Sequence, residues 1–476
     1  MPPRGDLYAR WSLEMRRAGL VRAGERVGVA VSGGADSVLL LAFMKQWSRA
    51  MGLVISAVHF NHHLRGVESE EDERFVRDLA TRLEVEFIQG EADVARVARE
   101  RRRNLEATAR ELRYRFFFSL INRGRLDKIA TAHTANDQAE TILLRLFRGT
   151  GTRGLGGIHP TLEGKIIRPF LHLTRAEIEG ELARRHLPFR LDSSNRDTRL
   201  RRNKLRMELL PQLQRDFNPE VVSLLSELAE RARDDEEFLE QQARERAGAW
   251  RVREGEEERI PVRPLAEFPK ALARRIIRQM ILSVRGSLLG VNHRHIEAVS
   301  RLATEAQSGR RLLLPGNVEA RREFDWLVIG PRSSVPADCA YKVSPPAEVP
   351  WPPLALNLRF KIVGAEAVGR AYNESEGVCL DAGKLQGEWV LRNWRPGDRF
   401  QPAGSRKSLK LKELLQKRRI AAAVRRAWPV LECGNEIVWV RGFPAAGSVA
   451  PAENSKALLV ISEQLRESFP SHRKRR

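Results

Sequence analysis

Cysteine is scarce in this 476-residue chain and does not occur in its first 338 residues. The three cysteines, Cys339, Cys379 and Cys433, are far apart, and none belongs to a Cys-x-x-Cys pair. This spacing excludes a disulfide framework and a thiolate zinc site as organising features of the fold.

Long apolar runs and a secretory leader are also lacking. No apolar run is long enough to span a bilayer, and the N-terminus has no basic segment followed by an apolar core. We therefore expect a cytoplasmic protein without a membrane-embedded part. Hydrophobic residues make up 42% of the chain, which suffices for packed interiors. The length indicates about two to four domains.

Acidic residues are outnumbered, because 61 Asp and Glu stand against 83 Lys and Arg and leave a net charge of +22. A merely arginine-rich composition would scatter these charges, whereas two stretches concentrate them. Residues 392–419 contain ten basic and two acidic residues, and residues 196–206 contain six and one. Such clusters favour a polyanionic partner, and nucleic acid is the first candidate.

The first 217 residues alternate between strand-like and helix-like segments. Strands are predicted at residues 26–31, 54–60, 85–89 and 128–132. Helices are predicted at residues 37–51, 68–83, 94–123 and 136–147. Strands separated by helices of this length form right-handed βαβ units. We therefore predict an α/β, doubly wound parallel sheet of Rossmann-like type, whose ligands bind beyond the carboxyl ends of the strands.

Two further domains are predicted after this sheet. Residues 218–332 form a mainly helical domain, and residues 333–365 form a linker because Pro, Ser and Ala are frequent there. Residues 366–476 form a small basic α+β domain. Its short strands and those that end the helical domain are predicted at residues 311–314, 324–329, 389–394, 430–433 and 436–440, with a basic helix at 409–417 and a disordered tail at 471–476.

The segment Ser32–Ser37, Ser-Gly-Gly-Ala-Asp-Ser, joins the first predicted strand to the first long helix of the sheet. Its glycines permit positive φ and close approach of a ligand, and the helix start supplies unpaired N–H groups for a phosphate. It lacks the Gly-Lys-Ser/Thr ending of the common P-loop. Asp36 offers a carboxylate for a magnesium ion between phosphate oxygens. Taken alone, the segment is also compatible with an ordinary strand-to-helix connection.

Polar residues follow two other strands. His59, His62 and His63 lie near the end of the second strand; no carboxylate or thiol completes a metal site there, so lining of a nucleotide pocket is favoured. His133 ends the fourth strand, and Asp137 and Glu140 share its helical face if the helix has begun. Capping of that helix is the alternative explanation for the acids.

A glycine-rich segment, residues 148–157, follows that helix and contains five glycines among basic residues. Such a segment suits a loop that wraps a phosphate or a nucleotide. Arg110 and Arg113 share a predicted helix on which a solvated charged face is the default. The segments 192–195 and 202–206 are rich in Asp, Ser, Asn and Arg, and a polar loop followed by a helix start also explains them.

Six motifs occur in the order found in the tRNA(Ile)-lysidine synthases, a family that the chain resembles over nearly its full length. They are Ser-Gly-Gly-x-Asp-Ser (32–37), His-x-Asn-His-x-Leu-Arg (59–65), Ala-Arg-x-x-Arg-Tyr (109–114), His-x-x-x-Asp-Gln-x-Glu-Thr (133–141), Arg-Gly-x-Gly-x-Arg-Gly-Leu (148–155) and Asp-x-Ser-Asn…Arg-Asn-x-x-Arg (192–206). The resemblance implies an N-terminal domain of the adenine nucleotide α-hydrolase type with a pyrophosphatase loop. One departure is Asn136, where many members carry a second Asp.

The resemblance also implies a reaction. ATP adenylates O2 of the wobble cytidine in the CAU anticodon of tRNA(Ile), and the ε-amino group of free L-lysine then displaces AMP to form lysidine. Asp36, which would hold Mg²⁺, and His133, Asp137 and Glu140 are the implied catalytic residues. The implied ATP-binding residues are Ser32, Gly33, Gly34, Ala35, Asp36, Ser37, His59 and Asn61. Those implied for lysine or the reacting nucleotide are Arg113, Asp137, Glu140, Arg202, Asn203 and Arg206, and those for the rest of the tRNA are Arg148, Arg153, Arg395, Arg399, Lys410 and Lys412.

Alternatives of other classes are weighed against this expectation. Thiolation of tRNA would need a cysteine near the nucleotide site, and glutamine-dependent synthesis would need an ammonia-generating domain; neither is recognisable. A non-catalytic tRNA-binding protein that senses ATP remains as the alternative, and intact acidic and glycine positions disfavour it. Whether two chains form a homodimer on one tRNA is left open by the sequence.

Overall fold

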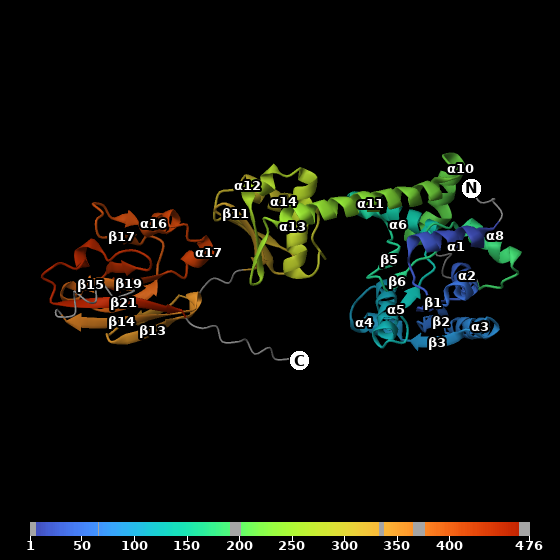
Figure 1. Ribbon diagram of the computed structural model, residues 1–476, viewed down its shortest axis with the longest axis horizontal. Helices are drawn as coiled ribbons and strands as arrows, with labels where there is room; N and C mark the ends of the chain where they lie inside the picture. Colours follow the sequence, from blue (N-terminus) through green and yellow to red (C-terminus); the bar gives the residue numbers. More distant parts are fainter. Residues whose placement is uncertain (1–5, 65, 191–200, 333–337, 365–376, 466–476) are drawn as a thin grey trace. The chain divides into compact units, whose positions relative to one another are not determined.

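The computed structural model describes residues 6–64, 66–190, 201–332, 338–364 and 377–465 (Figure 1). The chain divides into two compact units, residues 1–238 and 239–476, and the division falls within the long helix α11, Val221–Gly248. In the described ranges, no helix is long and apolar enough to cross a membrane.

The first unit contains a six-stranded sheet in the order β3-β2-β1-β4-β6-β5. The strands β1 to β4 and β6 pair in parallel, and only β5 is antiparallel. The order reverses between β1 and β4, which makes this edge the switch point where ligands of such sheets bind. The predicted doubly wound sheet is confirmed. Its strands are β1 Arg26–Ala30, β2 Val54–Asn61, β3 Glu86–Glu91, β4 Lys128–Ala130, β5 Thr161–Leu162 and β6 Ile166–Ile167.

Helices cover both faces of this sheet. Val27 and Val29 point into a core shared with α1, α2 and α8, whereas Val58 and Ile129 point into a second core shared with α5. Gly28, between the two valines, faces the second core, where a Cβ atom would lie 2.7 Å from Val58 Cγ2. The helices of this unit are α1 Leu7–Ala18, α2 Ala35–Met51, α3 Val67–Arg82, α4 Val94–Glu100, α5 Leu105–Asn122, α6 Ala135–Phe147, α7 Thr152–Leu155, α8 Arg175–Arg184, α9 Arg201–Lys204, the π-helical η2 Leu205–Leu209 and α10 Leu210–Asp216.

The single helix predicted at residues 94–123 is wrong, because α4 and α5 are separate helices. Arg102 adopts a left-handed conformation, with φ of 51°, and interrupts the helix. Asn104 then caps α5, because its side chain accepts a hydrogen bond from the backbone N–H of Ala107.

The second unit begins with helices packed on an antiparallel sheet, β7-β8-β11-β10-β9. The helical character predicted for this region is confirmed. The two strands predicted there, at 311–314 and 324–329, correspond to β9 and β11, and the other strands of this five-stranded sheet were not predicted. These elements are β7 Val252–Glu254, β8 Glu257–Pro261, α12 Val262–Glu267, α13 Lys270–Arg285, α14 His293–Thr304, β9 Arg311–Leu314, β10 Val318–Glu323 and β11 Trp326–Pro331.

The remaining elements form two four-stranded sheets, β12-β16-β19-β20 and β13-β14-β21-β15, around one core. The elements of this part of the chain include the strands of both sheets and several shorter elements. They are β12 Ala340–Lys342, β13 Ala347–Trp351, η3 Pro352–Leu354, β14 Leu356–Gly364, β15 Val378–Asp381, η5 Ala382–Lys384, β16 Trp389–Asn393, β17 Arg399–Phe400, β18 Leu409–Lys410, α16 Leu411–Lys417, α17 Ala422–Arg425, β19 Pro429–Cys433, β20 Glu436–Val440, η6 Gly447–Val449 and β21 Ala457–Leu465.

The linker predicted at residues 333–365 is wrong for residues 340–364. Strand β14 pairs along its whole length with β21, and β13 pairs with β14. Trp351 and Phe360 are fully buried in the core. Proline, serine and alanine set the composition here, but the apolar residues alternate with polar ones along β14, as a half-buried strand requires. Residues 333–337, the predicted boundary at 366 and the tail at 471–476 lie outside the described residues.

Candidate active site at the carboxyl edge of the sheet

The segment Ser32–Ser37 turns sharply between β1 and α2 at the switch point of the sheet. Gly33 has φ of 92°, a conformation that only glycine adopts easily. The Ser37 hydroxyl donates to the carbonyl of Gly34 at 2.9 Å and accepts from the N–H of Ser32 at 3.2 Å, so the turn is held from within. No side chain caps the start of α2. Its first N–H groups are therefore available to an anion such as a phosphate.

Asp36 lies in the first turn of α2 with one carboxylate oxygen lacking a partner. Its Oδ2 is 3.7 Å from Nη2 of Arg175, whereas its buried Oδ1 has no hydrogen-bond partner among the described residues. Burial, reinforced by the charge of Asp137 and opposed by Arg175 and Arg206, raises the pKa of Asp36 to about 6. An unpartnered buried carboxylate oxygen beside an uncapped helix start fits a hard cation such as Mg²⁺.

The chain offers few other ligands for such a cation. Within the described ranges, no group of three or more His, Cys, Asp or Glu side chains is placed to hold a metal ion. Most ligands of Mg²⁺ at Asp36 would therefore be phosphate oxygens and water, as is usual for nucleotide-bound magnesium.

Asp36→Asn should raise the melting temperature of the free protein at pH 8 but not at pH 4. Folding raises the pKa of Asp36 from its ordinary 3.8 to about 6, so the folded state binds the proton more tightly than the unfolded chain. The stability of the wild type therefore falls as the pH rises between these two pKa values. Removing the charge should stabilise the protein by roughly 1–3 kcal/mol above that range.

Asp127→Asn is the matched control for thermal unfolding at the two pH values. The hydrogen bonds that Arg26 donates to Asp127 lower the pKa of that carboxyl group, so its charge favours the folded state. This control should not stabilise the protein at pH 8. An Asp36→Asn variant that melts no higher than the wild type at pH 8 would contradict the conclusion that the buried charge of Asp36 destabilises the free protein.

His59 and Asn61, at the end of β2, are both engaged by the protein. His59 Nδ1 lies 2.8 Å from the carbonyl oxygen of Val31, and burial lowers the pKa of the ring. The neutral ring therefore carries its proton on Nδ1, and Nε2 is left as an acceptor. The Asn61 side chain donates to Glu73 at 3.2 Å and accepts from the N–H of His63 at 3.0 Å. The expected contacts of His59 and Asn61 with ATP stay a prediction.

Helix α6 begins with a capping box, as the helix-capping alternative expected. Oδ2 of Asp137 accepts from both the N–H and the hydroxyl of Thr134, and the Thr134 hydroxyl accepts from the N–H of Asp137. Capping accounts for only one oxygen of Asp137. The other oxygen, Oδ1, belongs to a network with Glu140 and two arginines.

Arg202 and Arg206 neutralise Asp137 and Glu140. Arg202 lies 2.9 Å from Asp137 Oδ1 and donates to Glu140 Oε2 at 2.6 Å. Arg206 donates to Glu140 Oε1 at 2.6 Å and to Asp137 Oδ1 at 3.4 Å. Burial raises the pKa of Asp137, but the two arginines and His133 lower it by a larger amount. The net shift of the pKa is therefore downward, and the carboxylate is ionised. All four carboxylate oxygens thus have partners within the chain.

The helical spacing of both pairs builds this network. Arg202 and Arg206 are four residues apart, Asp137 and Glu140 are three apart, and each pair therefore lies on one helical face. A small core that includes Ala139, Leu143 and Leu205 packs α6 against the helix formed by α9, η2 and α10. The sequence predicted these residues as one site but not their direct pairing. Asn203 is buried on the same helix, and the segment 192–195 lies outside the described residues.

Three arginines lie close enough to His133 to act on its charge. His133 Nδ1 lies 3.0 Å from the Thr131 hydroxyl. Burial, reinforced by Arg168, Arg110 and Arg113 and opposed by Asp137, lowers the pKa of His133 to about 3. Within the described ranges, none of these arginines forms an ion pair. The result is a neutral imidazole in a positively charged environment, which suits a phosphate or a carboxylate. Arg168 was not predicted as a site residue from the sequence, because the strand that precedes it, β6, is very short.

Asn136 has a structural role at the position where the family often carries Asp. Its Oδ1 accepts a hydrogen bond from the backbone N–H of Arg175 at 2.8 Å. That contact anchors the start of α8, whose Arg175 side chain pairs with Asp36. Asn136 thus acts on Asp36 through Arg175, and its oxygen is occupied by the protein.

The glycine-rich segment is a compact turn held through its carbonyl groups. Arg145 donates to the carbonyls of Gly154 and Gly157, both at 2.9 Å, and Arg233 donates to that of Gly156 at 2.9 Å. A Cβ atom on Gly157 would lie 2.3 Å from Gln138 Oε1. Close packing therefore explains part of the glycine content. Arg148 and Arg153 are exposed on this turn, and wrapping of a phosphate by the turn stays a prediction.

The basic cluster of the C-terminal sheets divides into buried and exposed side chains. Arg392 is buried and donates to Asp398 at 2.8 Å and to Glu432 at 2.5 Å, so it stabilises the fold. Phe400 is buried as well and presents no ring to a ligand. The four basic residues of this cluster that are predicted to bind tRNA are exposed on or near β17, β18 and α16. They are Arg395, Arg399, Lys410 and Lys412.

Comparisons with known proteins agree with this organisation. Three family models match the chain: a PP-loop domain at residues 11–213, the TilS substrate binding domain at 261–328 and the TilS substrate C-terminal domain at 390–461. Among solved structures, the U34-tRNA thiolase NcsA from Methanococcus maripaludis is similar, with 14% identity over 47% of this chain and 79% of that chain and a TM-score of 0.39.

Curated relatives match over nearly their full length. The tRNA(Ile)-lysidine synthase of Solibacter usitatus is 39% identical over 92% of this chain and 98% of its own length. That of Geobacter sulfurreducens is 34% identical over 93% of this chain and 94% of its own length. With all three domain models in order as well, the chain belongs to the tRNA(Ile)-lysidine synthase family.

Proposed function

We propose that this chain is an ATP-dependent ligase that converts the wobble cytidine in the CAU anticodon of tRNA(Ile) to lysidine. The observation that carries the proposal is Asp36, whose unpartnered buried oxygen lies beside the uncapped start of α2 at the switch point. A site that only sensed ATP would not need a carboxylate with an open oxygen at this position. The family to which the chain belongs supplies the substrate and the product.

In the first step, O2 of the cytidine attacks the α-phosphorus of ATP, and the bond to the β-phosphate oxygen breaks to release pyrophosphate. The N–H groups at the start of α2 hold the phosphates, and Asp36 would hold Mg²⁺. That ion would supply positive charge near the departing pyrophosphate. Arg110, Arg113 and Arg168, whose charges act on His133, stabilise negative charge, while neutral His133 orients a phosphate or the base.

In the second step, the ε-amine of lysine attacks C2 of the cytidine, and the bond from C2 to the oxygen carried by AMP breaks. The bound ε-ammonium gives up one proton to solvent to become the attacking amine, and AMP leaves with that oxygen. Asp137 and Glu140 bind the lysine ammonium before this step. Since Arg202 and Arg206 occupy both acids in the free protein, lysine must exchange with one guanidinium. Arg202 is the candidate, because its side chain is 35% exposed against 18% for Arg206.

Lysine-dependent release of pyrophosphate separates this proposal from a protein that only binds tRNA and senses ATP. Labelled lysine should be transferred to tRNA with a CAU anticodon, and the elongator methionine tRNA should serve as control. ATP and tRNA binding without transfer of lysine would support the non-catalytic alternative.

Arg395→Ala, Lys410→Ala and Lys412→Ala should each weaken tRNA binding and reduce its dependence on salt. If each exposed side chain neutralises one phosphate, each substitution should flatten the plot of log affinity against log salt by about 0.7–0.9 units. Arg359→Ala is the matched control, because Arg359 already pairs with Glu348 at 3.0 Å. A folded triple variant with an unchanged salt slope would mean that these cations serve only solubility.

A further inference from the structure

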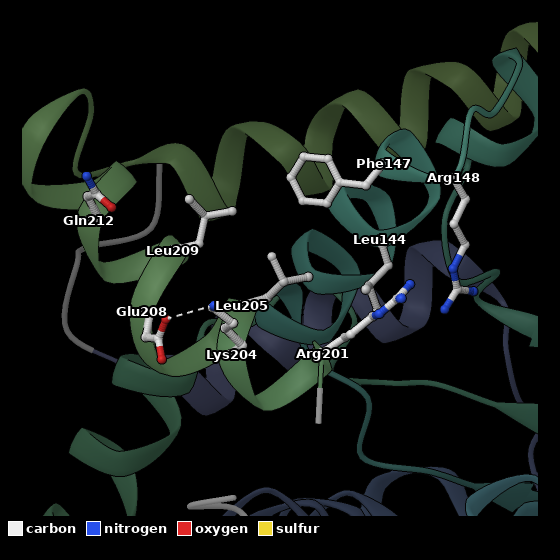
Figure 2. Close-up of a pocket in the computed structure, with 9 residues that line it drawn as sticks. All are labelled: Leu144, Phe147, Arg148, Arg201, Lys204, Leu205, Glu208, Leu209 and Gln212. Carbon is white, nitrogen blue, oxygen red and sulfur yellow. Dashed lines mark ion pairs between the residues drawn. The ribbon is translucent and has the colours of Figure 1, made fainter. Parts of the chain in front are cut away.

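A pocket of about 420 Å³ lies between the C-terminal end of α6 and the helix formed by α9, η2 and α10 (Figure 2). The side chains of Leu144, Leu205 and Leu209 give it an apolar wall. Its volume is within the roughly 300–1,000 Å³ of small-molecule sites. None of the residues expected to bind ATP lines it. The lining residues are Leu144, Phe147, Arg148, Arg201, Lys204, Leu205, Glu208, Leu209 and Gln212.

Phe147 is the aromatic residue of this pocket and is unusually open to solvent. It is 68% exposed, although it ends a helix in which Ala135, Ala139, Ile142 and Leu143 are buried. Figure 2 shows its ring beside the side chains of Leu205 and Leu209 in this view. Leu146, next to Phe147 in the sequence, and Met207, in the segment 205–209 that also lines the pocket, are more than 40% exposed as well. An exposed aromatic next to an apolar wall marks a surface that another molecule covers.

The rim of the pocket is basic. Arg148, Arg201 and Lys204 border it, against one acid, Glu208. Glu208 lies 3.9 Å from Lys204, and both side chains are more than half exposed, so this ion pair is weak. Neither arginine forms an ion pair with an acid in the described part of the chain. Charge complementarity therefore favours an anionic occupant that also carries an apolar face.

The pocket continues directly from the acid–arginine network of the candidate active site. Leu144 follows Glu140 by one helical turn, and Arg201 and Leu205 each precede one of the network arginines. We propose that the pocket binds one unstacked base of the tRNA anticodon loop next to the reacting cytidine, with the base on Phe147 and its phosphate at Arg148 or Arg201. Single-stranded RNA is commonly read in this way, by aromatic stacking within a basic groove. The inference rests on the proposed function, because it takes the anticodon loop to be the substrate.

A binding cycle between protein and RNA tests the assignment. The RNA is the anticodon stem-loop of tRNA(Ile), with each loop nucleotide replaced in turn by an abasic one. Phe147→Ala should weaken binding of the intact hairpin by about 5- to 100-fold, and Phe147→Trp should preserve it. At one loop position, the abasic nucleotide should weaken binding to the wild type by a similar factor and cause no further loss with Phe147→Ala. Phe238→Ala, at a phenylalanine that is 62% exposed, is the control.

Other outcomes would overturn the proposal. Additive losses at every loop position would mean that no base contacts Phe147, and unchanged binding by Phe147→Ala would mean that the ring carries no affinity. A dimer in the wild type that Phe147→Ala dissociates would assign the pocket to a second copy of the chain. Lysine transfer to the intact hairpin is measured in parallel, so that a failure of the proposed function is seen separately as absence of transfer.

Discussion

Asp36→Ala should lower the rate of pyrophosphate release by about 100- to 1,000-fold and leave tRNA affinity nearly unchanged. The magnitude is that of removing one fixed charge that acts on a transferring group. The carboxylate is positioned for this role before any ligand binds, because its Oδ1 is buried and unpartnered and the N–H groups of the first turn of α2 lie beside it. The tRNA makes most of its phosphate contacts elsewhere in the proposed scheme, so its affinity should not depend on this residue.

Pyrophosphate release in the presence of tRNA and lysine is the measurement, together with tRNA binding in the absence of ATP. Asp127→Ala is the matched control, since Asp127 precedes β4 at the opposite edge of the sheet and pairs with Arg26. A variant that turns over at the wild-type rate would remove the loop from the mechanism. Loss of both activities would indicate a damaged fold.

The sequence predicted the sheet and its ligand edge well because both depend on local patterns. Apolar strands followed by glycine or polar residues are readable one at a time, and parallel topology then brings their carboxyl ends together. Ser32–Ser37, His59 and His133 were placed at this edge for that reason. The break at Arg102 and the capping role of Asn104 were missed, because both neighbours of the break have helical patterns.

Contacts between distant segments were not predictable in the same way. The pairing of Arg202 with Glu140 spans 62 residues, and nothing in either segment specifies its partner. The linker prediction failed for a related reason. Strand β14 is stabilised by β21, nearly a hundred residues later, so its own composition understates its burial. A deletion beginning at residue 366 would remove that partner, and point substitutions are therefore the sounder test of the basic C-terminal cluster.

Glu140→Gln should raise the lysine concentration needed for half-maximal rate by about 10- to 100-fold while tRNA adenylation in the absence of lysine continues. The glutamine keeps the shape of the side chain and one acceptor oxygen but loses the charge. A hydrogen bond between charged groups contributes about 1.5–3 kcal/mol, and its loss corresponds to this change in lysine affinity. Glu140 is fully buried, so water cannot replace the missing charge.

Glu111→Gln is the matched control for Glu140→Gln. Glu111 also binds several arginines, Arg101, Arg103 and Arg115, but its side chain is 35% exposed and lies outside the network of the candidate site. It should leave the lysine requirement unchanged. Thermal unfolding of both variants shows how much of any effect is structural, because Arg206 loses part of its charge balance when Glu140 becomes neutral.

The two roles that the acids can have differ in which step fails. If Asp137 and Glu140 bind the lysine ammonium, Glu140→Gln impairs the second step alone, and Arg202→Ala, which removes the guanidinium that competes with lysine, does not raise the lysine requirement. If the acids serve only to hold Arg202 and Arg206 against a phosphate, Glu140→Gln and Arg202→Ala both slow adenylation, and the lysine requirement stays at the wild-type value.

Adenylation without lysine, measured as exchange of labelled pyrophosphate into ATP, distinguishes the two roles. Equal loss of exchange and of lysine transfer in both variants would place the lysine site elsewhere. The three arginines whose charges act on His133 would then have to be explained together with Arg202 and Arg206 as one anion-binding surface.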